Sequence, residues 1–347
     1  MSLSANLIIW YYKNARSLPW RKTKDPYLIW LSEIILQQTR VEQGLKYYIA
    51  FKYSFPDILS LSKASEDQVL KLWEGLGYYS RARNMMSAAK QIADVHQGVF
   101  PNTYEDIISL KGIGPYTAAA IASFSFGLPY AVVDGNVFRV LARYYDVDIP
   151  INSPQGKKYF GELAQEVLDK SNAATHNQAI MEFGALYCRP SNPHCEDCIL
   201  HQNCQAYAAQ KVTQLPVKLK KLSIKKRFLH FFFITDGNDF LLEKRHSKDI
   251  WKGLYQLPLI ESRSDLDTPS ILQSMELKNI LSQESFHLQS TMEIQHKLSH
   301  RLLHIRFYYL VVLKIPKSDY QELAIHNIGQ YAFPKPIKLF FDQRIHS

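Results

Sequence analysis

The spacing of apolar residues changes partway along the chain, and this change limits the possible folds more than any other feature. Before residue 210, apolar positions recur at helical spacing between short breaks marked by Gly or Pro, with clear examples at 65–76, 116–126 and 157–169. Farther along, residues 228–235 and 240–244 flank a Gly/Asn turn signal. This second pattern predicts a β-hairpin.

The segment at which the pattern changes is strongly basic. Residues 211–227 hold seven Lys or Arg, no acid and one Pro, as is typical of an exposed linker. A further β-rich run at 304–314 lies beyond it. A chain of 347 residues is also long for a single core. We therefore predict an α-helical domain at 1–210, a basic linker at 211–227 and a smaller α+β domain at 228–347.

The composition indicates a folded protein with an acidic partner. Hydrophobic residues make up 46% of the chain, and the formal net charge is +9, which favours nucleic acid. The first twenty residues lack the basic region of a signal peptide, and no apolar run approaches the roughly 20 residues of a membrane span. We expect a soluble, cytoplasmic protein without a membrane partner.

All four cysteines lie within 17 residues, in the spacing C-x6-C-x2-C-x5-C: Cys188, Cys195, Cys198 and Cys204. A disulfide framework is not expected in a large chain without a signal peptide. Structural zinc usually uses two short spacings, and only one C-x2-C is present. Four thiolates from one segment favour an iron–sulfur cluster, although zinc with His194 or His201 as alternative ligands stays open.

A glycine-containing turn at 110–116 separates two helical patterns. Gly112 and Gly114 allow close approach of the backbone to a ligand, and Pro115 suits the first turn of the next helix. Free amides at that helix end favour a phosphate. A plain helix–turn–helix in which glycine only makes the turn tight is the alternative.

Two carboxylates have surroundings that predict different protonation. The helix expected over 28–40 is apolar in nearly every direction, so Glu33 should be buried and its pKa should rise, as suits a general acid. Asp134 stands just before an apolar helix, where its carboxylate caps the helix and the amides keep it ionised. Such a divided pair is typical of acid/base sites. If each residue is considered alone, Glu33 could instead lie on a solvated side of its helix, and Asp134 could be only a helix cap.

The order of turn, aspartate and cysteine loop resembles the endonuclease III, or helix–hairpin–helix, superfamily. Bifunctional members carry a lysine in the hairpin that forms an imine with the sugar, whereas this chain has Tyr116. Tyr116 and the stretches WLSEIILQQT at 30–39, GLGYYSR at 75–81 and DGNV at 134–137 resemble the adenine DNA glycosylase (MutY) family. The resemblance implies an all-α glycosylase core with a [4Fe-4S] loop, followed by a Nudix-like α+β domain.

The same resemblance implies a role for each matching residue. Glu33 protonates adenine N7, Asp134 stabilises the cationic sugar, and Tyr116 and Asn136 assist at this centre. The hairpin glycines Gly112 and Gly114 hold a DNA phosphate, and the four cysteines hold the cluster. The implied substrate contacts are Trp20, Arg21, Gln38, Thr39, Tyr78, Gln178, Ser299 and His300.

The C-terminal part resembles the Nudix-like domain with which this family inspects the opposite strand. Residues 251–258 look like the start of a Nudix core, but the glutamate-dense helix of a hydrolase does not follow, so we expect no pyrophosphatase activity. The family's Phe-Ser-His loop corresponds best to residues 298–300, where Leu298 departs from the pattern. Ser299 and His300 are thus predicted to contact 8-oxoguanine, with an ordinary strand start as the alternative.

The predicted activity is monofunctional removal of adenine opposite 8-oxoguanine or guanine in double-stranded DNA, by a monomer. One alternative is an endonuclease III-like glycosylase and lyase acting on damaged pyrimidines, against which Tyr116 and the extra domain argue. The other is a non-catalytic, DNA-binding redox sensor, which would have no use for Glu33 in an apolar helix.

Overall fold

The computed structural model describes residues 2–219, 224–246 and 249–345. Spatial proximity divides these residues into two compact units. Among the described residues, unit 1 comprises 2–63 and 84–219, and unit 2 comprises 64–83, 224–246 and 249–345. The domain limits predicted above remain predictions, since compact units and composition divide the chain by different criteria. No described helix is long and apolar enough to cross a membrane.

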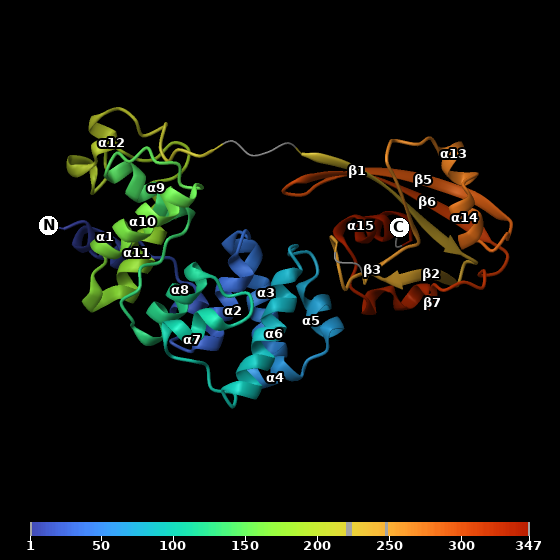
Figure 1. The fold of residues 1–347 in the computed structure, drawn as a ribbon, viewed down its shortest axis with the longest axis horizontal. Coiled ribbons are helices and arrows are strands. Elements are labelled where there is room, and N and C mark those ends of the chain that lie inside the picture. Colours follow the sequence, from blue (N-terminus) through green and yellow to red (C-terminus); the bar gives the residue numbers. More distant parts are fainter. Residues whose placement is uncertain (1, 220–223, 247–248, 346–347) are drawn as a thin grey trace. The chain divides into compact units, whose positions relative to one another are not determined.

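Unit 1 is helical (Figure 1). Its short 3-10 turns are η1 Pro19–Arg21, η2 Lys170–Asn172 and η3 His201–Asn203. Its α-helices are α1 Leu3–Asn14, α2 Pro26–Leu36, α3 Val41–Ser54, α4 Ile58–Lys63, most of α6 Ser80–Val95, α7 Tyr104–Ser109, α8 Pro115–Phe126, α9 Gly135–Tyr144, α10 Pro154–Val167, α11 Ala173–Leu186 and α12 Gln205–Ala208.

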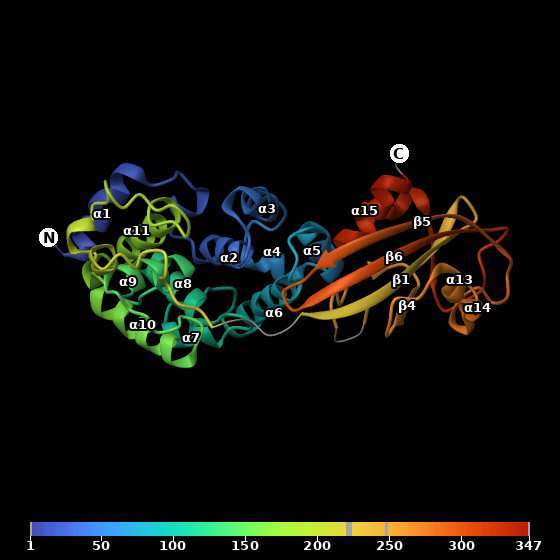
Figure 2. The ribbon, with the colours of Figure 1, turned by 90° about the horizontal axis from the view of Figure 1, so that it is seen from above.

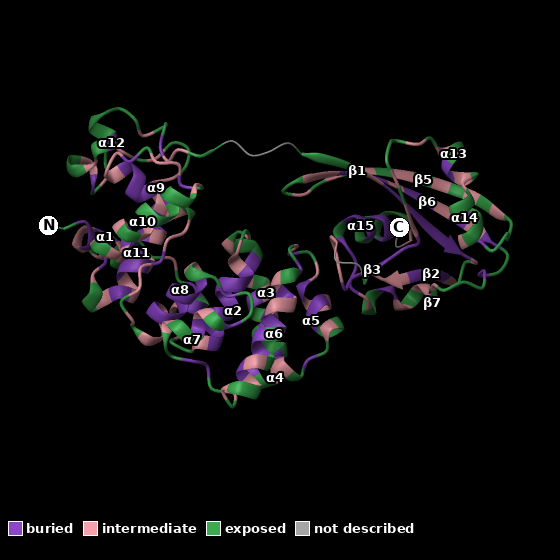
Figure 3. Ribbon diagram, viewed as in Figure 1, coloured by how far each residue is buried: buried purple, intermediate pink, exposed green. Residues whose placement is uncertain are grey.

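Local interactions explain where α2 begins and ends. Asp25 caps α2 with its carboxylate, and Pro26 follows at the first helical position, where its missing N–H costs no hydrogen bond. The helix predicted to reach residue 40 ends at Leu36, because Gln38 adopts a left-handed φ of 57°. Nine of the eleven residues of α2 are buried, as the apolar pattern predicted (Figure 3).

Two long helices of unit 1 pack closely at a glycine. Val137, Val140 and Leu141 of α9 share a hydrophobic core with Ile180 and Phe183 of α11. At Gly184 of α11, an added Cβ would lie 2.7 Å from the Cβ of Asn136 and 3.0 Å from its carbonyl oxygen. This close approach sets the distance between α11 and the first turn of α9.

Unit 2 is built on a seven-stranded mixed sheet of order β3-β2-β1-β6-β5, in which β4 pairs with β1 and β7 with β2. Figure 2 shows β1, β6 and β5 side by side. The strands are β1 Lys225–Thr235, β2 Asp239–Lys244, β3 Tyr255–Gln256, β4 Leu259–Ser262, β5 Phe286–Lys297, β6 Arg301–Val312 and β7 Gln321–Ala324. The remaining elements are α5 Glu66–Trp73, α13 Thr268–Leu272, α14 Met275–Ile280, η4 Ile325–Gln330 and α15 Lys335–Arg344.

The central strand β1 is covered on both faces, which explains its nearly continuous apolar sequence. Phe231 and Phe233 pack with Phe340 and Phe341 of α15. Phe232 and Ile234, which alternate with them, belong to a second core that includes Leu277 of α14. The hairpin predicted from the turn signal is confirmed, since β1 and β2 pair antiparallel, and the β-rich run at 304–314 lies within β6 except for its last two residues.

Residues 64–83 belong to unit 2 although they lie far from the sheet in sequence. Ser65 and Gln68 form a capping box at the start of α5. The Glu74 carboxylate then accepts hydrogen bonds from the backbone N–H of Phe333 at 2.9 Å and from Lys338 Nζ at 2.8 Å. The segment that follows, 75–81, is thus anchored beside the C-terminal helix.

The tight packing at Gly184 is testable by one methyl group. We expect Gly184→Ala to lower the free energy of unfolding by about 1–3 kcal/mol, because the new Cβ displaces Asn136. Chemical denaturation measures the difference. The matched control is Gly161→Ala in α10, where an added Cβ meets nothing within 4 Å and the helix should be stabilised by up to about 1 kcal/mol. Equal stability of Gly184→Ala and the wild type would contradict the packing argument.

Candidate active site

A cavity of about 210 Å³ lies within unit 1 and gathers most of the predicted chemistry-bearing residues. Its walls come from η1, α2, α8, α11 and the N-cap of α9. The polar residues that line it are Arg16, Arg21, Ser32, Glu33, Thr39, Tyr116, Asp134, Asn136, Gln178 and Glu182.

Glu33 reaches this cavity from the buried helix α2. The residue is 8% exposed, and its Oε2 accepts a hydrogen bond of 2.8 Å from the hydroxyl of Tyr116 on α8. Burial raises the pKa of Glu33 to about 7, and the negative charge of Asp134 adds to the rise, while the Tyr116 hydrogen bond and Arg21 oppose it. The predicted burial and raised pKa are both confirmed. Near neutral pH this carboxyl therefore exists in both protonation states.

Asp134 is the N-cap of α9, as predicted. Its Oδ1 accepts the backbone N–H groups of Asn136 and Val137, each at 2.8 Å, and its Oδ2 accepts the Asn136 side-chain amide at 2.7 Å. Burial nevertheless raises the pKa of Asp134 above its ordinary value, against the lowering effect of these hydrogen bonds and of Arg139. The direction of this pKa shift is opposite to the one expected from the helix amides, because the burial of Asp134 outweighs them.

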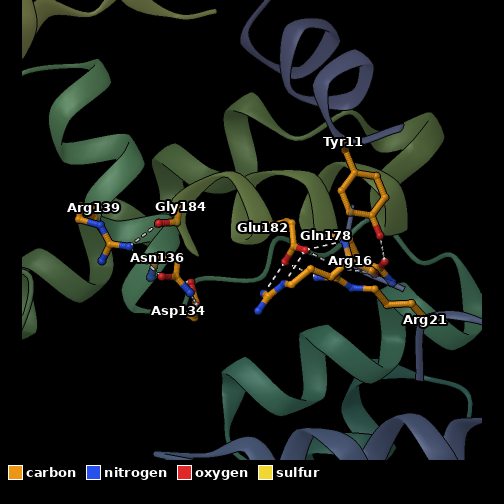
Figure 4. Close-up of polar contacts among 9 residues, drawn as sticks. All are labelled: Tyr11, Arg16, Arg21, Asp134, Asn136, Arg139, Gln178, Glu182 and Gly184. Carbon is orange, nitrogen blue, oxygen red and sulfur yellow. Dashed lines mark hydrogen bonds and ion pairs between the residues drawn. The ribbon is translucent and has the colours of Figure 1, made fainter. Parts of the chain in front are cut away.

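Asn136 is held in place by Arg139, one turn farther along α9 (Figure 4). Arg139 Nη2 donates to Asn136 Oδ1 at 2.8 Å and to the carbonyl oxygen of Gly184 at 2.7 Å. Its Nε donates to the carbonyl oxygen of Cys188 at 2.7 Å. The Asp134–Asn136 pair is therefore connected by hydrogen bonds to the end of α11.

On another wall of the cavity, Glu182 of α11 binds two arginines (Figure 4). Arg16 donates to it from the backbone N, Nε and Nη2 at 2.7–2.9 Å, and Arg21 donates from Nη1 and Nη2 at 2.9 and 2.7 Å. Burial opposes ionisation of Glu182, but these bonds lower its pKa to about 2. The sequence interpretation missed Arg16 and Glu182. The helical spacing of Glu182 four residues after Gln178 would have placed both on one face.

Gln178, Trp20, Arg21 and Thr39 all line the cavity. Gln178 Oε1 accepts a hydrogen bond of 2.5 Å from the hydroxyl of Tyr11 on α1. Gln38, by contrast, is exposed and does not line the cavity. The structure thus places four of the predicted substrate contacts in the same cavity as Glu33: Trp20, Arg21, Thr39 and Gln178.

The hairpin between α7 and α8 has one glycine with a left-handed backbone. Gly112 has φ of 80°, and an added Cβ would lie 2.5 Å from the Cβ of Asn84. Gly114 is the N-cap of α8 with φ of −100°, which any residue adopts, and nothing lies within 4 Å of its Cβ position. Only Gly112 therefore has the conformational need predicted for both glycines, whereas Gly114 leaves open space at the start of α8.

In unit 2, the structure brings together two residues that are 221 positions apart. Tyr78 follows two left-handed glycines, is 47% exposed and has φ of 47°. Its hydroxyl forms a hydrogen bond with the hydroxyl of Ser299. Ser299 and His300 are exposed at the turn between β5 and β6, and Leu298 packs against the core beneath them. The predicted loop is therefore a hairpin tip.

None of the four cysteines forms a disulfide, and all four line one cavity at the end of α11. Two N–H groups point at sulfur: Arg143 Nη1 lies 3.3 Å from Cys188 Sγ, and the Leu200 amide lies 3.4 Å from Cys198 Sγ. Within the described residues, no three His, Cys, Asp or Glu side chains converge closely enough to hold a single metal ion. His194 and His201 line the same cavity.

Comparison with known proteins identifies the class. Residues 31–166 match the family model described as HhH-GPD superfamily base excision DNA repair protein, and residues 230–343 match the NUDIX domain. A thermostable thymine-DNA glycosylase of known structure has 28% identity and a TM-score of 0.56, covering 59% of this chain and 95% of its own. An endonuclease III–DNA complex, at 17% identity and a TM-score of 0.52, shares the fold. The helical core is that of a DNA glycosylase.

The relatives named adenine DNA glycosylase narrow this class. The protein of Buchnera aphidicola subsp. Baizongia pistaciae is 38% identical over 317 residues, or 89% of this chain and 86% of the relative. The human protein is 38% identical over 218 residues, or 60% of this chain and 40% of the relative. The chain belongs to the adenine DNA glycosylase family. It is a DNA-repair enzyme that hydrolyses N-glycosyl bonds, its partner is DNA, and its C-terminal domain is Nudix-like.

The raised pKa of Glu33 makes folding stability depend on pH. The pKa of Glu33 is about 7 in the folded protein, against an ordinary value of 4.5. The contribution of Glu33 to the free energy of unfolding is therefore complete below pH 4.5 and is lost as the pH rises through 7. We expect the free energy of unfolding of Glu33→Gln to equal that of the wild type near pH 4.5 and to exceed it by about 3 kcal/mol near pH 8. Denaturant unfolding at both pH values measures this. Exposed Glu284→Gln is the control for loss of a carboxylate, and a pH-independent difference for Glu33→Gln would disprove the prediction.

Proposed function

We propose that the enzyme removes adenine mispaired with 8-oxoguanine or guanine in duplex DNA, and that it hydrolyses the glycosidic bond without cutting the strand. The observation that carries the proposal is the cavity in which buried Glu33, hydrogen-bonded to Tyr116, lies with Asp134. Cleavage of an N-glycosidic bond needs both a proton for the leaving base and negative charge near the cationic sugar. The two carboxyl groups supply these in one site.

Glu33 is the proposed general acid. In its protonated form it donates to N7 of adenine, which lets the base leave as a neutral molecule. A pKa of about 7 leaves a large fraction protonated near neutral pH, whereas an exposed glutamate would be almost fully ionised. Tyr116 lies within hydrogen-bond distance of the same carboxyl and assists in placing its proton.

Asp134 is proposed to stabilise the positive charge that develops on the sugar as the base departs. Its three N–H donors hold the carboxylate in one orientation, and two of them are the first amides of α9. Burial raises its affinity for a proton but also strengthens its interaction with a cation in a site of low polarity. Asn136 positions the carboxylate, and Arg139 positions Asn136.

Selection of adenine is assigned to Trp20, Arg21, Thr39 and Gln178, which line the cavity around Glu33. They offer one aromatic face and several hydrogen-bond donors and acceptors, as a flipped base requires. With Tyr116 where bifunctional enzymes have a lysine, no imine with the sugar forms, so we propose a monofunctional enzyme. The same Tyr116 argues against a lyase acting on pyrimidines.

Recognition of the opposite strand is assigned to Ser299 and His300 in unit 2, and Gln38 and Tyr78 are the residues proposed to enter the base stack. Tyr78 and Ser299 share a hydrogen bond and both are exposed, so they are available to a DNA base. Gly112 and Gly114 are the proposed phosphate contacts, because the open space at the start of α8 leaves its amides accessible. We propose that the protein acts as a monomer in the cytoplasm.

We propose that the four cysteines hold a [4Fe-4S] cluster. Zinc would need four donors about 2.3 Å from one point. All four sulfurs line one cavity, and N–H groups point at two of them, as is common around iron–sulfur clusters, while the single C-x2-C spacing is unlike that of structural zinc. The cluster would order the loop from residue 188 to residue 204 and supply no chemistry to the base.

The central test uses a duplex with adenine opposite 8-oxoguanine or guanine. We expect alkali-dependent strand breakage at the adenine with the wild type, and a loss of at least about 100-fold in single-turnover rate with Asp134→Asn. The affinity of the variant for the same duplex should stay close to that of the wild type, because the substitution removes a charge that acts in the transition state and leaves the DNA-contacting surface unchanged. If Asp134→Asn turns over at the wild-type rate, Asp134 serves only as the N-cap of its helix.

Lesion reading has its own test. We expect Ser299→Ala and His300→Ala to narrow the preference for 8-oxoguanine over guanine by about tenfold each, since one polar base contact is worth roughly 1–3 kcal/mol. Single-turnover rates on both duplexes measure the ratio. Point variants are preferable to deletion of residues after 226, because residues 64–83 pack in the same compact unit. If the ratio of the two rates is unchanged in both variants, this hairpin tip does not recognise the lesion.

The cluster assignment predicts about four irons and four sulfides per chain in purified protein. Metal analysis of anaerobically and aerobically prepared samples measures them. Cys198→Ser should lower solubility and DNA binding before it affects chemistry, because the loop loses its order. Stoichiometric zinc in both preparations would overturn the assignment.

A further inference from the structure

The Arg16–Glu182–Arg21 cluster forms a charged wall of the cavity, and the function proposed above gives a role to Arg21 but none to Arg16 or Glu182. The Glu182 side chain is 1% exposed, against 14% for Arg21 and 32% for Arg16. Its two oxygens receive five N–H bonds, so the carboxylate is fully satisfied as an anion. Two guanidinium groups are thereby held against one carboxylate at the edge of the site.

The arginines are fixed in position as well as in charge. Arg21 Nη1 also donates to the carbonyl oxygen of Arg16 at 3.2 Å, and its guanidinium lies 5.6 Å from the centre of the Tyr11 ring. Tyr11 in turn bonds Gln178. Figure 4 shows these side chains together around Glu182. Removal of the Glu182 charge alone would therefore leave two cations beside the cavity.

The balance of charge in the cavity depends on Glu182. The titratable groups that line it are Arg16, Arg21, Glu33, Tyr116, Asp134 and Glu182. Among these lining groups, ionised Asp134 and Glu182 match the two arginines while Glu33 keeps its proton, and Arg139 acts on Asp134 from α9. Without the Glu182 charge, one cation is in excess, and ionised Glu33 would restore neutrality. Helix α3 packs on α2, and the negative charge of its exposed Glu42 adds to the stabilisation of the Arg16 cation by Glu182.

We propose that Glu182 is a positioning residue for catalysis: as the counter-ion of Arg16 and Arg21, it preserves the neutral, proton-donating form of Glu33. This inference rests on the proposed role of Glu33 as the general acid. Arg21 already opposes the rise in the pKa of Glu33 in the intact cluster. The same cation without its partner would oppose it more strongly.

The test is the pH dependence of base excision under single-turnover conditions, on a duplex with adenine opposite guanine. For the wild type, the rate constant should fall as pH rises above about 7, because Glu33 loses its proton. For Glu182→Gln, the same decline should begin at lower pH by about one unit, a roughly tenfold loss of rate on the alkaline side. Glu182→Asp, which keeps the charge, should retain the wild-type position.

A charge-balanced double variant separates this electrostatic role from a structural one. In Glu182→Gln/Arg16→Met, one cation is removed together with the anion, so the decline should return toward the wild-type pH. Arg16→Met alone should move it to higher pH. If the double variant stays as displaced as Glu182→Gln, or if Glu182→Gln does not displace the decline, the inference is wrong.

Two readouts distinguish the possible failures. A wild-type profile without an alkaline decline would show that the proposed role of Glu33 fails, independently of Glu182. Thermal unfolding of each variant measures folding. If Glu182→Gln does not fold, the upward displacement expected for Arg16→Met decides the question, and its absence would overturn the inference.

Discussion

A carboxyl group buried in a wall of apolar helices is the constraint on which the arrangement of the site depends. Desolvation makes an isolated buried carboxylate costly, so Glu33 favours its neutral form. The neighbours of Glu33 must then neither supply an excess of positive charge nor admit bulk water. α2 excludes water with nine buried residues, whereas the hydrogen bond that Tyr116 donates favours the ionised form and limits the rise in the pKa of Glu33.

Asp134 shows the opposite solution to burial. Its carboxylate takes three N–H donors from the start of α9, and the close packing at Gly184 holds that turn in place. α11 therefore acts at several points of the site: Gly184 sets the position of Asn136, Glu182 binds the two arginines, and Gln178 lines the cavity. A displacement of this one helix would disturb the acid, the anion and the adenine contacts together.

Unit 2 joins parts of the chain that composition separates. Glu74 ties the segment carrying Tyr78 to Phe333 and Lys338, and Tyr78 bonds Ser299 at the hairpin tip. The basic stretch at 211–227 stays a predicted linker, and β1 begins within it, at Lys225. No periodicity in the sequence indicates that α5 packs with the sheet, because that contact depends on side chains far apart along the chain.

The sequence by itself determined the local features of this protein: the helical core, the β-hairpin, the cap at Asp134, the burial of Glu33 and the cysteine spacing. Each depends on neighbours within a few residues, where propensity and periodicity act. Only the tertiary structure decided the end of α2 at Leu36, the burial that raises the pKa of Asp134, and the Arg16–Glu182–Arg21 cluster. These depend on what other elements bring against a residue, because desolvation and ion pairing are set by three-dimensional neighbours.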